Sequence, residues 1–125
     1  MPNISKVTIG TTTYDIAGGG GGTAVSTATS SSATTTVNTN TITKITVAPT
    51  SITFTSDIET TNIVEWGAIF TTGSSQTSVT IAMSNGATIN WAGDITGLVS
   101  DSVYSVSVIG NSSIGYTGEL VPLFY

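Results

Sequence analysis

The sequence predicts an all-β protein whose C-terminal part is an antiparallel β-sandwich. Serine and threonine make up about a third of the 125 residues, and threonine, being β-branched, favours strands. Short segments of alternating apolar and polar residues recur about every 8–12 residues, with turn residues between them, which is typical of sandwiches and barrels. No window carries apolar residues at the 3.6-residue spacing of an amphipathic helix.

The first segment predicts a small hairpin, or an extended arm, that anchors the chain. Residues 4–16 (ISKVTIGTTTYDI) form two alternating arms around a turn near Gly10. Because a lone two-stranded hairpin is marginally stable in water, we expect residues 1–17 to dock on another chain rather than to form a disordered tail. The residues expected to make the anchor are Ile4, Val7, Ile9, Tyr14 and Ile16.

A run of glycines then separates this anchor from the rest of the chain. Consecutive glycines cannot pack a core and have the most backbone freedom to lose, so we expect a hinge. The hinge residues are Gly18, Gly19, Gly20, Gly21 and Gly22. Residues 23–40 are nearly all Ser, Thr, Ala and Val, which fits a flexible linker or an ordered stalk wound from three copies. The sequence thus predicts an anchor (1–17), a linker or stalk (18–40) and a sandwich head (41–125).

The strands expected in the head follow from alternation and turn signals. Apolar residues alternate on both sides of the Pro-containing turn at 48–50, and Ser-Asn-Gly at 84–86 is a strong turn signal. Residues 114–125 predict a last strand, which Pro122 places at a sheet edge. The other expected strands cover residues 42–47, 52–54, 63–70, 79–83, 89–91 and 103–109.

Charge and composition exclude several classes of partner. The net charge is −5, and Lys6 and Lys44 are the only basic residues. Two lysines cannot neutralise a nucleic-acid backbone or hold an anionic membrane surface, so neither partner is expected. The chain has no cysteine, and its start lacks the charged and apolar regions of a signal peptide, which fits synthesis in a reducing cytoplasm.

The side chains offer little chemistry, so we expect no catalytic residue, no metal and no cofactor. The absence of histidine and cysteine removes imidazole and thiol catalysis and the usual zinc ligands. Asp57 and Glu59 alternate and could form a glycosidase carboxylate pair, but we interpret them as solvated turn residues. Asp94 and Asp101 could hold calcium with loop carbonyls, although their spacing matches no known calcium loop.

Five aromatic residues are candidates for stacking on a sugar: Trp66, Trp91, Tyr104, Tyr116 and Tyr125. Trp66 and Trp91 lie within alternating apolar patterns, which favours core positions over an exposed sugar platform. Tyr116 lies near glycines and Tyr125 is terminal, so these two are the candidate glycan or interface contacts.

An ordered series of short motifs resembles the small β domain that ends many tailed-bacteriophage structural proteins. In that domain an FTTGSS strand end, an apolar strand, a W-x-G turn and a YxISIxNG strand follow one another. The corresponding segments here are IFTTGSS (69–75), Ile81, INWAGD (89–94) and SVYSVSVIGN (102–111). Residues 4–16 also resemble the openings of phage virion proteins of the form ISKVxIGxTTYDI. Together these stretches cover about half of the chain, and the sequence departs from the pattern after Asn111.

This resemblance implies a non-enzymatic virion protein, since such domains carry no catalytic residues. The short chain favours a capsid-attached head fibre or decoration protein, made in the host cytoplasm and held by its N-terminus. The implied partners are capsid or tail proteins of the same virion, further copies of the chain as a trimer, and host-surface glycans. The alternatives are a tail-fibre or baseplate component, a carbohydrate-binding module, a small glycosidase and a pilus-like subunit.

Overall fold

The computed structural model describes residues 6–9, 12–15, 25–56 and 60–123, and its regular structure is entirely β. This part of the chain includes no helix with the length and apolar character that crossing a lipid bilayer requires. The strands are β1 (Lys6–Ile9), β2 (Thr12–Asp15), β3 (Ser26–Ser30), β4 (Thr34–Val37), β5 (Thr41–Ile45), β6 (Ser51–Phe54), β7 (Val64–Thr71), β8 (Thr80–Met83), β9 (Ile89–Trp91), β10 (Val103–Asn111) and β11 (Gly115–Pro122).

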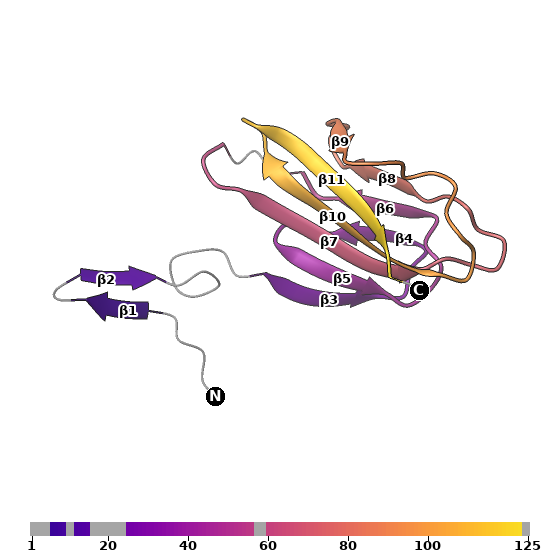
Figure 1. The fold of residues 1–125 in the computed structure, drawn as a ribbon, viewed down its shortest axis with the longest axis horizontal. Coiled ribbons are helices and arrows are strands. Elements are labelled where there is room, and N and C mark those ends of the chain that lie inside the picture. Colours follow the sequence, from indigo (N-terminus) through magenta and orange to yellow (C-terminus); the bar gives the residue numbers. More distant parts are fainter. Residues whose placement is uncertain (1–5, 10–11, 16–24, 57–59, 124–125) are drawn as a thin grey trace.

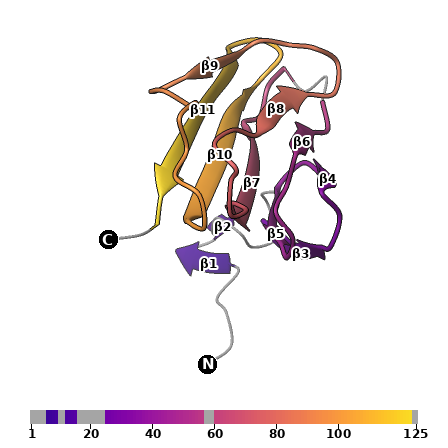
Figure 2. The ribbon, with the colours of Figure 1, turned by 90° about the vertical axis from the view of Figure 1, so that its right-hand side faces the viewer.

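Two sheets form the head, which confirms the all-β class. A six-stranded sheet has the order β3-β5-β7-β10-β11-β9, and a three-stranded sheet has the order β4-β6-β8 (Figure 1). The two sheets face each other, as the view along the strands in Figure 2 shows. Strands β1 and β2 pair only with each other and form a separate two-stranded sheet.

The prediction that the sandwich is antiparallel is wrong, because the six-stranded sheet is mixed and the three-stranded sheet is parallel. Strands β3 to β8 alternate between the sheets, so that β3, β5 and β7 run parallel in one and β4, β6 and β8 run parallel in the other. The chain therefore winds through three successive turns, each placing one strand in each sheet. Each connection crosses to the opposite sheet instead of turning back, so the chain always returns in the same direction. Among the described strands of the head, only β7–β10 and β10–β11 pair antiparallel, while β9 runs parallel to β11.

The head begins earlier in the chain than residue 41. Residues 26–37, which the sequence places in a linker or stalk, contribute β3 and β4 to the two sheets. Val37 is fully buried and Thr35 is 3% exposed. The Thr35 hydroxyl lies 2.8 Å from the Ser30 hydroxyl, which joins β4 to β3 across the first turn of the winding chain.

The core lies between the sheets and is built on aromatic residues. Trp66 is 2% exposed and its indole N–H donates to the Thr55 carbonyl at 3.0 Å. The Trp66 ring meets Tyr116 edge-on, with centroids 5.7 Å apart, and lies 6.4 Å from the ring of Phe54. Inward-facing aliphatic residues of both sheets complete this core: Val37, Ile45, Ile52, Val64, Val106 and Val108.

The last strand occupies an edge only in its final residues. Strand β11 lies between β10 and β9, but β9 pairs only with Tyr116–Gly118. Beyond this point the Leu123 N–H donates to the Val103 carbonyl of β10 at 2.8 Å. By the alternation of an antiparallel ladder, the nitrogen of Pro122 therefore faces away from β10, on the side where β9 has ended. The proline thus removes no ladder hydrogen bond.

Candidate functional site

The N-terminal hairpin has two unlike faces. Its register sets Val7 opposite Tyr14 and Ile9 opposite Thr12, while Lys6 lies opposite Asp15. Directly opposed residues of an antiparallel pair belong to the same face of the ribbon. By this register, the positions of Val7, Ile9 and Tyr14 fall on one face of the ribbon and those of Lys6 and Asp15 on the other.

The rest of the expected anchor and hinge lies outside the described residues. This applies to Ile4, Ile16 and the glycines at 18–22. Their interpretation as anchor and hinge stays a prediction.

Of the four acidic candidates, Asp94 and Asp101 lie in the segment between β9 and β10. Asp57 and Glu59 lie outside the described residues. The Asp94 carboxylate accepts hydrogen bonds from the Thr96 hydroxyl at 2.7 Å and from the Thr96 N–H at 2.8 Å, and these bonds lower the pKa of Asp94. Asp101 has a left-handed backbone (φ 53°), and its N–H donates to the Gly73 carbonyl at 3.1 Å. Within the described ranges, no three acidic, histidine or cysteine side chains come together as a metal site would require.

The aromatic candidates for sugar contact lie in or beside the core. Tyr116, expected at an interface, is only 5% exposed and packs against Trp66. Its hydroxyl-bearing ring is therefore a core element rather than a surface contact. Trp91 is partly exposed and packs against the core, whereas Tyr125 lies outside the described residues.

A cluster of buried hydrogen bonds, which the sequence did not predict, holds the loop of residues 92–102 before β10 against the end of β7. The Thr72 hydroxyl donates to the Val99 carbonyl at 2.6 Å and accepts from the Ser102 N–H at 2.9 Å. The Val99 N–H in turn donates to the Tyr104 hydroxyl at 2.8 Å. The signal was available, because Thr72 is two residues from buried Phe70 and so shares its inward direction.

A second missed residue, Asn111, holds the turn between β10 and β11. Its side chain is 4% exposed, and its amide donates to the Asn62 carbonyl at 3.0 Å. Its side-chain oxygen accepts from the N–H groups of Ser113 at 3.0 Å and Ile114 at 2.9 Å. The asparagine thus connects the turn to the segment that leads into β7.

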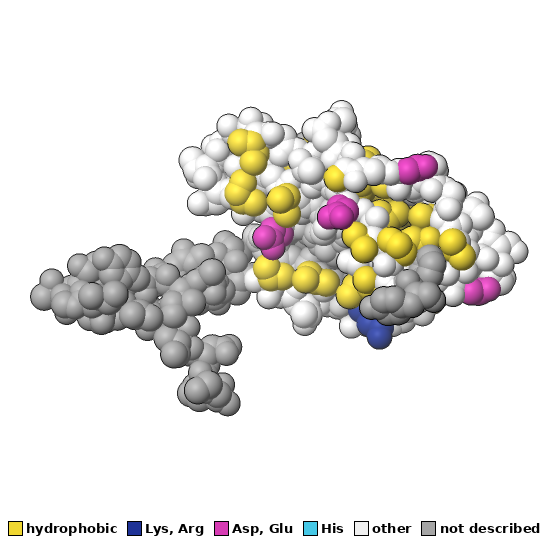
Figure 3. Space-filling view, viewed as in Figure 1, with side chains coloured by type: hydrophobic (Ala, Val, Ile, Leu, Met, Phe, Trp, Pro, Cys, Tyr) yellow, Lys and Arg dark blue, Asp and Glu magenta, His cyan; other side chains and the backbone are white. Residues whose placement is uncertain are grey.

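The outer side of the six-stranded sheet presents apolar side chains to solvent, and we call it the outer face. Two rows of cross-strand neighbours span it from β5 to β11: Ile42–Gly67–Ser107–Glu119 and Lys44–Ile69–Ser105–Val121. Ile109, beside the first row, is 49% exposed, Ile42 is 42% exposed and Val121 is 38% exposed. Figure 3 shows apolar groups spread over this side of the head, with acidic groups between them and a basic group at the lower edge.

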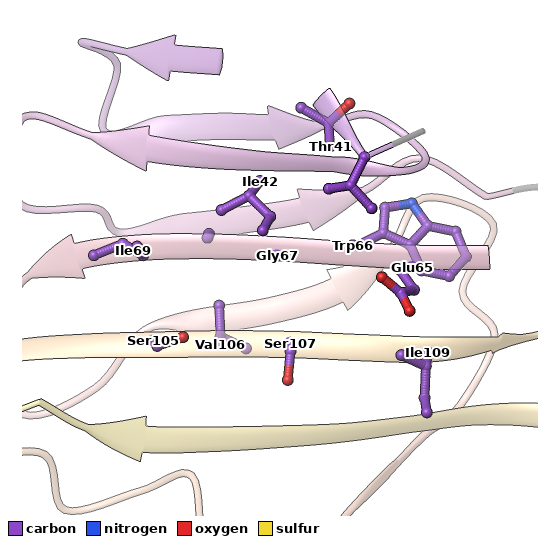
Figure 4. Close-up of a pocket in the computed structure, with 12 residues that line it drawn as sticks. Thr41, Ile42, Glu65, Trp66, Gly67, Ile69, Ser105, Val106, Ser107 and Ile109 are labelled. Carbon is purple, nitrogen blue, oxygen red and sulfur yellow. The ribbon is translucent and has the colours of Figure 1, made fainter. Parts of the chain in front are cut away.

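Two shallow hollows shape this outer face. The larger, of about 170 Å³, lies over Gly67 between Ile42, Ile69 and Ile109 (Figure 4). The smaller, of about 120 Å³, lies on the other side of Ile109, beside Thr117 and Glu119. Ile69 and Ile109 alternate with buried Phe70 and Val108, but alternation within one strand does not show that four strands place such residues side by side.

Two surfaces are candidates for contact with another molecule: the N-terminal hairpin and the outer face. Their residues are small polar, aliphatic and a few charged side chains on strands. Comparison of the chain with protein-family models, with curated proteins and with solved structures finds no match.

Proposed function

We propose that this chain is a non-enzymatic structural protein of a tailed-bacteriophage virion, a head fibre or decoration protein attached to the capsid. The N-terminal hairpin holds the chain on a capsid protein, and the sandwich is the displayed part. A tail-fibre or baseplate position, in which a tail protein replaces the capsid protein, is the runner-up. The motif series of the head and the opening segment supply the virion setting.

The observation that carries this proposal is the hairpin, which pairs with no strand of the sandwich. Four residues per strand cannot stabilise a two-stranded sheet in water, so the hairpin needs a surface to pack on. Its register gives one face with Val7, Ile9 and Tyr14, which suits an apolar groove or the face of a neighbouring sheet. Edge pairing with a strand of the capsid protein would add backbone hydrogen bonds.

The carbohydrate-binding alternative receives less support from the described residues. Sugar recognition by stacking needs an exposed aromatic platform, whereas Trp66 and Tyr116 are 2% and 5% exposed. A glycan contact by the displayed head would have to use other groups, such as the partly exposed Trp91.

The test is incorporation of variants into particles of the phage that encodes the chain. Val7→Asp puts a charge on the apolar face of the hairpin, and Thr8→Asp puts the same charge on the opposite face. We expect Val7→Asp, like deletion of residues 1–17, to remove the chain from gradient-purified particles, measured by mass spectrometry against the major capsid protein. Thr8→Asp should be incorporated at the normal level. Full occupancy of the deletion variant would refute the anchor.

A further inference from the structure

We propose that the outer face of the six-stranded sheet binds the same face of a second copy of this chain across a two-fold axis. A solvated β-sheet face normally presents polar residues outward, in alternation with the apolar residues that point inward. Here the outward positions include Ile42, Ile69, Ile109 and Val121, on four adjacent strands. Contiguous exposed apolar surface of this kind marks an interaction site.

The relief of the outer face suits a partner with raised side chains. A Cβ atom at Gly67 would lie 3.1 Å from Cγ1 of Ile42, so the missing side chain forms the floor of the larger hollow. Ser105 and Ser107 continue this floor on β10 with short side chains. Ile109 stands between the two hollows, and Ile42 stands at the border of the larger one (Figure 4). The face therefore carries both raised aliphatic side chains and the spaces that could receive them.

The charges identify the occupant as a second copy. Lys44 and Glu119 lie at diagonally opposite corners of the two rows, on β5 and β11. A two-fold axis in the plane of the interface exchanges these corners, so each Lys44 meets the partner's Glu119 and two ion pairs form. On a flat sheet with strands about 4.8 Å apart and a rise of about 6.8 Å per two residues, this axis also brings Ile42 within about 3 Å of the partner's Ile109 in projection. One arrangement thus pairs the charges and the most exposed isoleucines of the face together.

The area of the outer face is small for a stable dimer interface. Four strands at about 4.8 Å spacing and seven residues at about 3.3 Å give a footprint of roughly 440 Å². Because side chains project from the sheet, the accessible area of the outer face is larger than this flat footprint. Specific interfaces bury about 800 Å² on each partner. We therefore expect a reversible dimer with a dissociation constant in the micromolar range.

Sedimentation velocity of the full-length chain, from about 2 to about 200 μM, tests this proposal. Ile109→Glu should raise the dissociation constant of the dimer at least about tenfold, because it buries two like charges at the contact. Ile114→Glu is the matched control, since Ile114 is 69% exposed in the turn after β10 and lies off the outer face. It should leave the constant within about twofold, and thermal unfolding checks that both variants are folded.

Charge exchange tests the two-fold geometry itself. Lys44→Glu and Glu119→Lys should each weaken the dimer, because each variant sets like charges against one another. The double variant restores both pairs and should return the dissociation constant to within about twofold of the original. A monomer at every concentration, a trimer, or a dimer insensitive to Ile109→Glu would overturn the proposal, as would a double variant weaker than both singles. None of these outcomes depends on attachment to a particle, which Val7→Asp tests separately.

Discussion

Replacing Gly110 by alanine should destabilise the head more than any other glycine-to-alanine change in its strands. Gly110 lies in the middle of the six-stranded sheet, paired with Val64 of β7 on one side and Tyr116 of β11 on the other. Its φ of 144° lies in a region that residues with a Cβ rarely adopt. An added Cβ would overlap the carbonyl oxygen of Gly115 and lie 2.9 Å from its carbon and 3.0 Å from Cα of Tyr116.

The expected cost follows from these two features. A sparsely populated backbone conformation costs about 1–3 kcal/mol. Relieving an overlap with backbone atoms, which no rotamer change can do, costs about another 1–3 kcal/mol. The free energy of unfolding should therefore fall by about 2–6 kcal/mol, which for a domain of this size lowers Tm by at least about 10 °C.

Urea unfolding followed by tryptophan fluorescence measures this loss, since the buried indole of Trp66 reports on the core. The control is Gly67→Ala, a change in the neighbouring strand of the same sheet. There the new Cβ meets only the side chain of Ile42, which is 42% exposed and can move aside. We expect Gly67→Ala to change stability by less than about 1 kcal/mol. An unfolding free energy of Gly110→Ala within about 0.5 kcal/mol of that of the original chain would contradict the close approach of the Gly115 carbonyl to Gly110.

Three further predictions concern the polar contacts of the head. Thr72→Val should cost about 1–3 kcal/mol because its hydroxyl bonds are buried, whereas Thr71→Val, at the exposed last residue of β7, should cost less than about 0.5 kcal/mol in the same urea titration. Asn111→Leu should lower the unfolding free energy by about 2–3 kcal/mol, since three backbone groups lose their partner, and an unchanged value would mean that water replaces the amide. Thr96→Ala should raise the pKa of Asp94 in an NMR titration, because the Thr96 hydroxyl is the main group that lowers it. The stabilisation that this hydrogen bond gives the folded state is present above the ordinary carboxyl pKa and is lost as the pH falls through the lowered pKa. An unchanged pKa of Asp94 in the variant would contradict this cause.

Alternation located the strands of the head after residue 40, but neither β3 and β4 nor the partners of any strand. The strand expected at 103–109 is β10, and the one expected at 89–91 is β9. Alternation fixes which side chains share a face, but it carries no information on whether the next connection turns back or crosses to the other sheet. The alternation therefore could not predict the parallel pairing of β3 to β8, and we predicted an antiparallel sandwich instead.

Glycines misled the interpretation of Tyr116. Gly115 and Gly118 favoured an interface position for this residue, but both belong to β11 and Tyr116 is buried. Gly118 lies in the strand because the ring of Trp91 occupies the space of its side chain: an added Cβ would lie 2.7 Å from Cζ3 of the indole. A glycine that makes room for a neighbouring aromatic ring looks the same in a sequence as a glycine that makes a turn.

The two candidate surfaces differ in how far the sequence revealed them. The apolar residues of the hairpin could be found in advance, because both arms alternate cleanly around one turn. The outer face could not, because it joins single outward residues from four strands whose order only the fold supplies. We propose attachment through the N-terminal hairpin and self-association through the head.

Cross-linking of intact particles with an amine-reactive reagent tests the attachment most directly, since the two lysines lie on different surfaces. Lys6 is on the hairpin and Lys44 is on the outer face of the head. The account predicts that mass spectrometry finds links from Lys6 to a capsid or tail protein of the same particle. Links to other virion proteins from Lys44 alone, with none from Lys6, would mean that the head makes the attachment and would contradict the account.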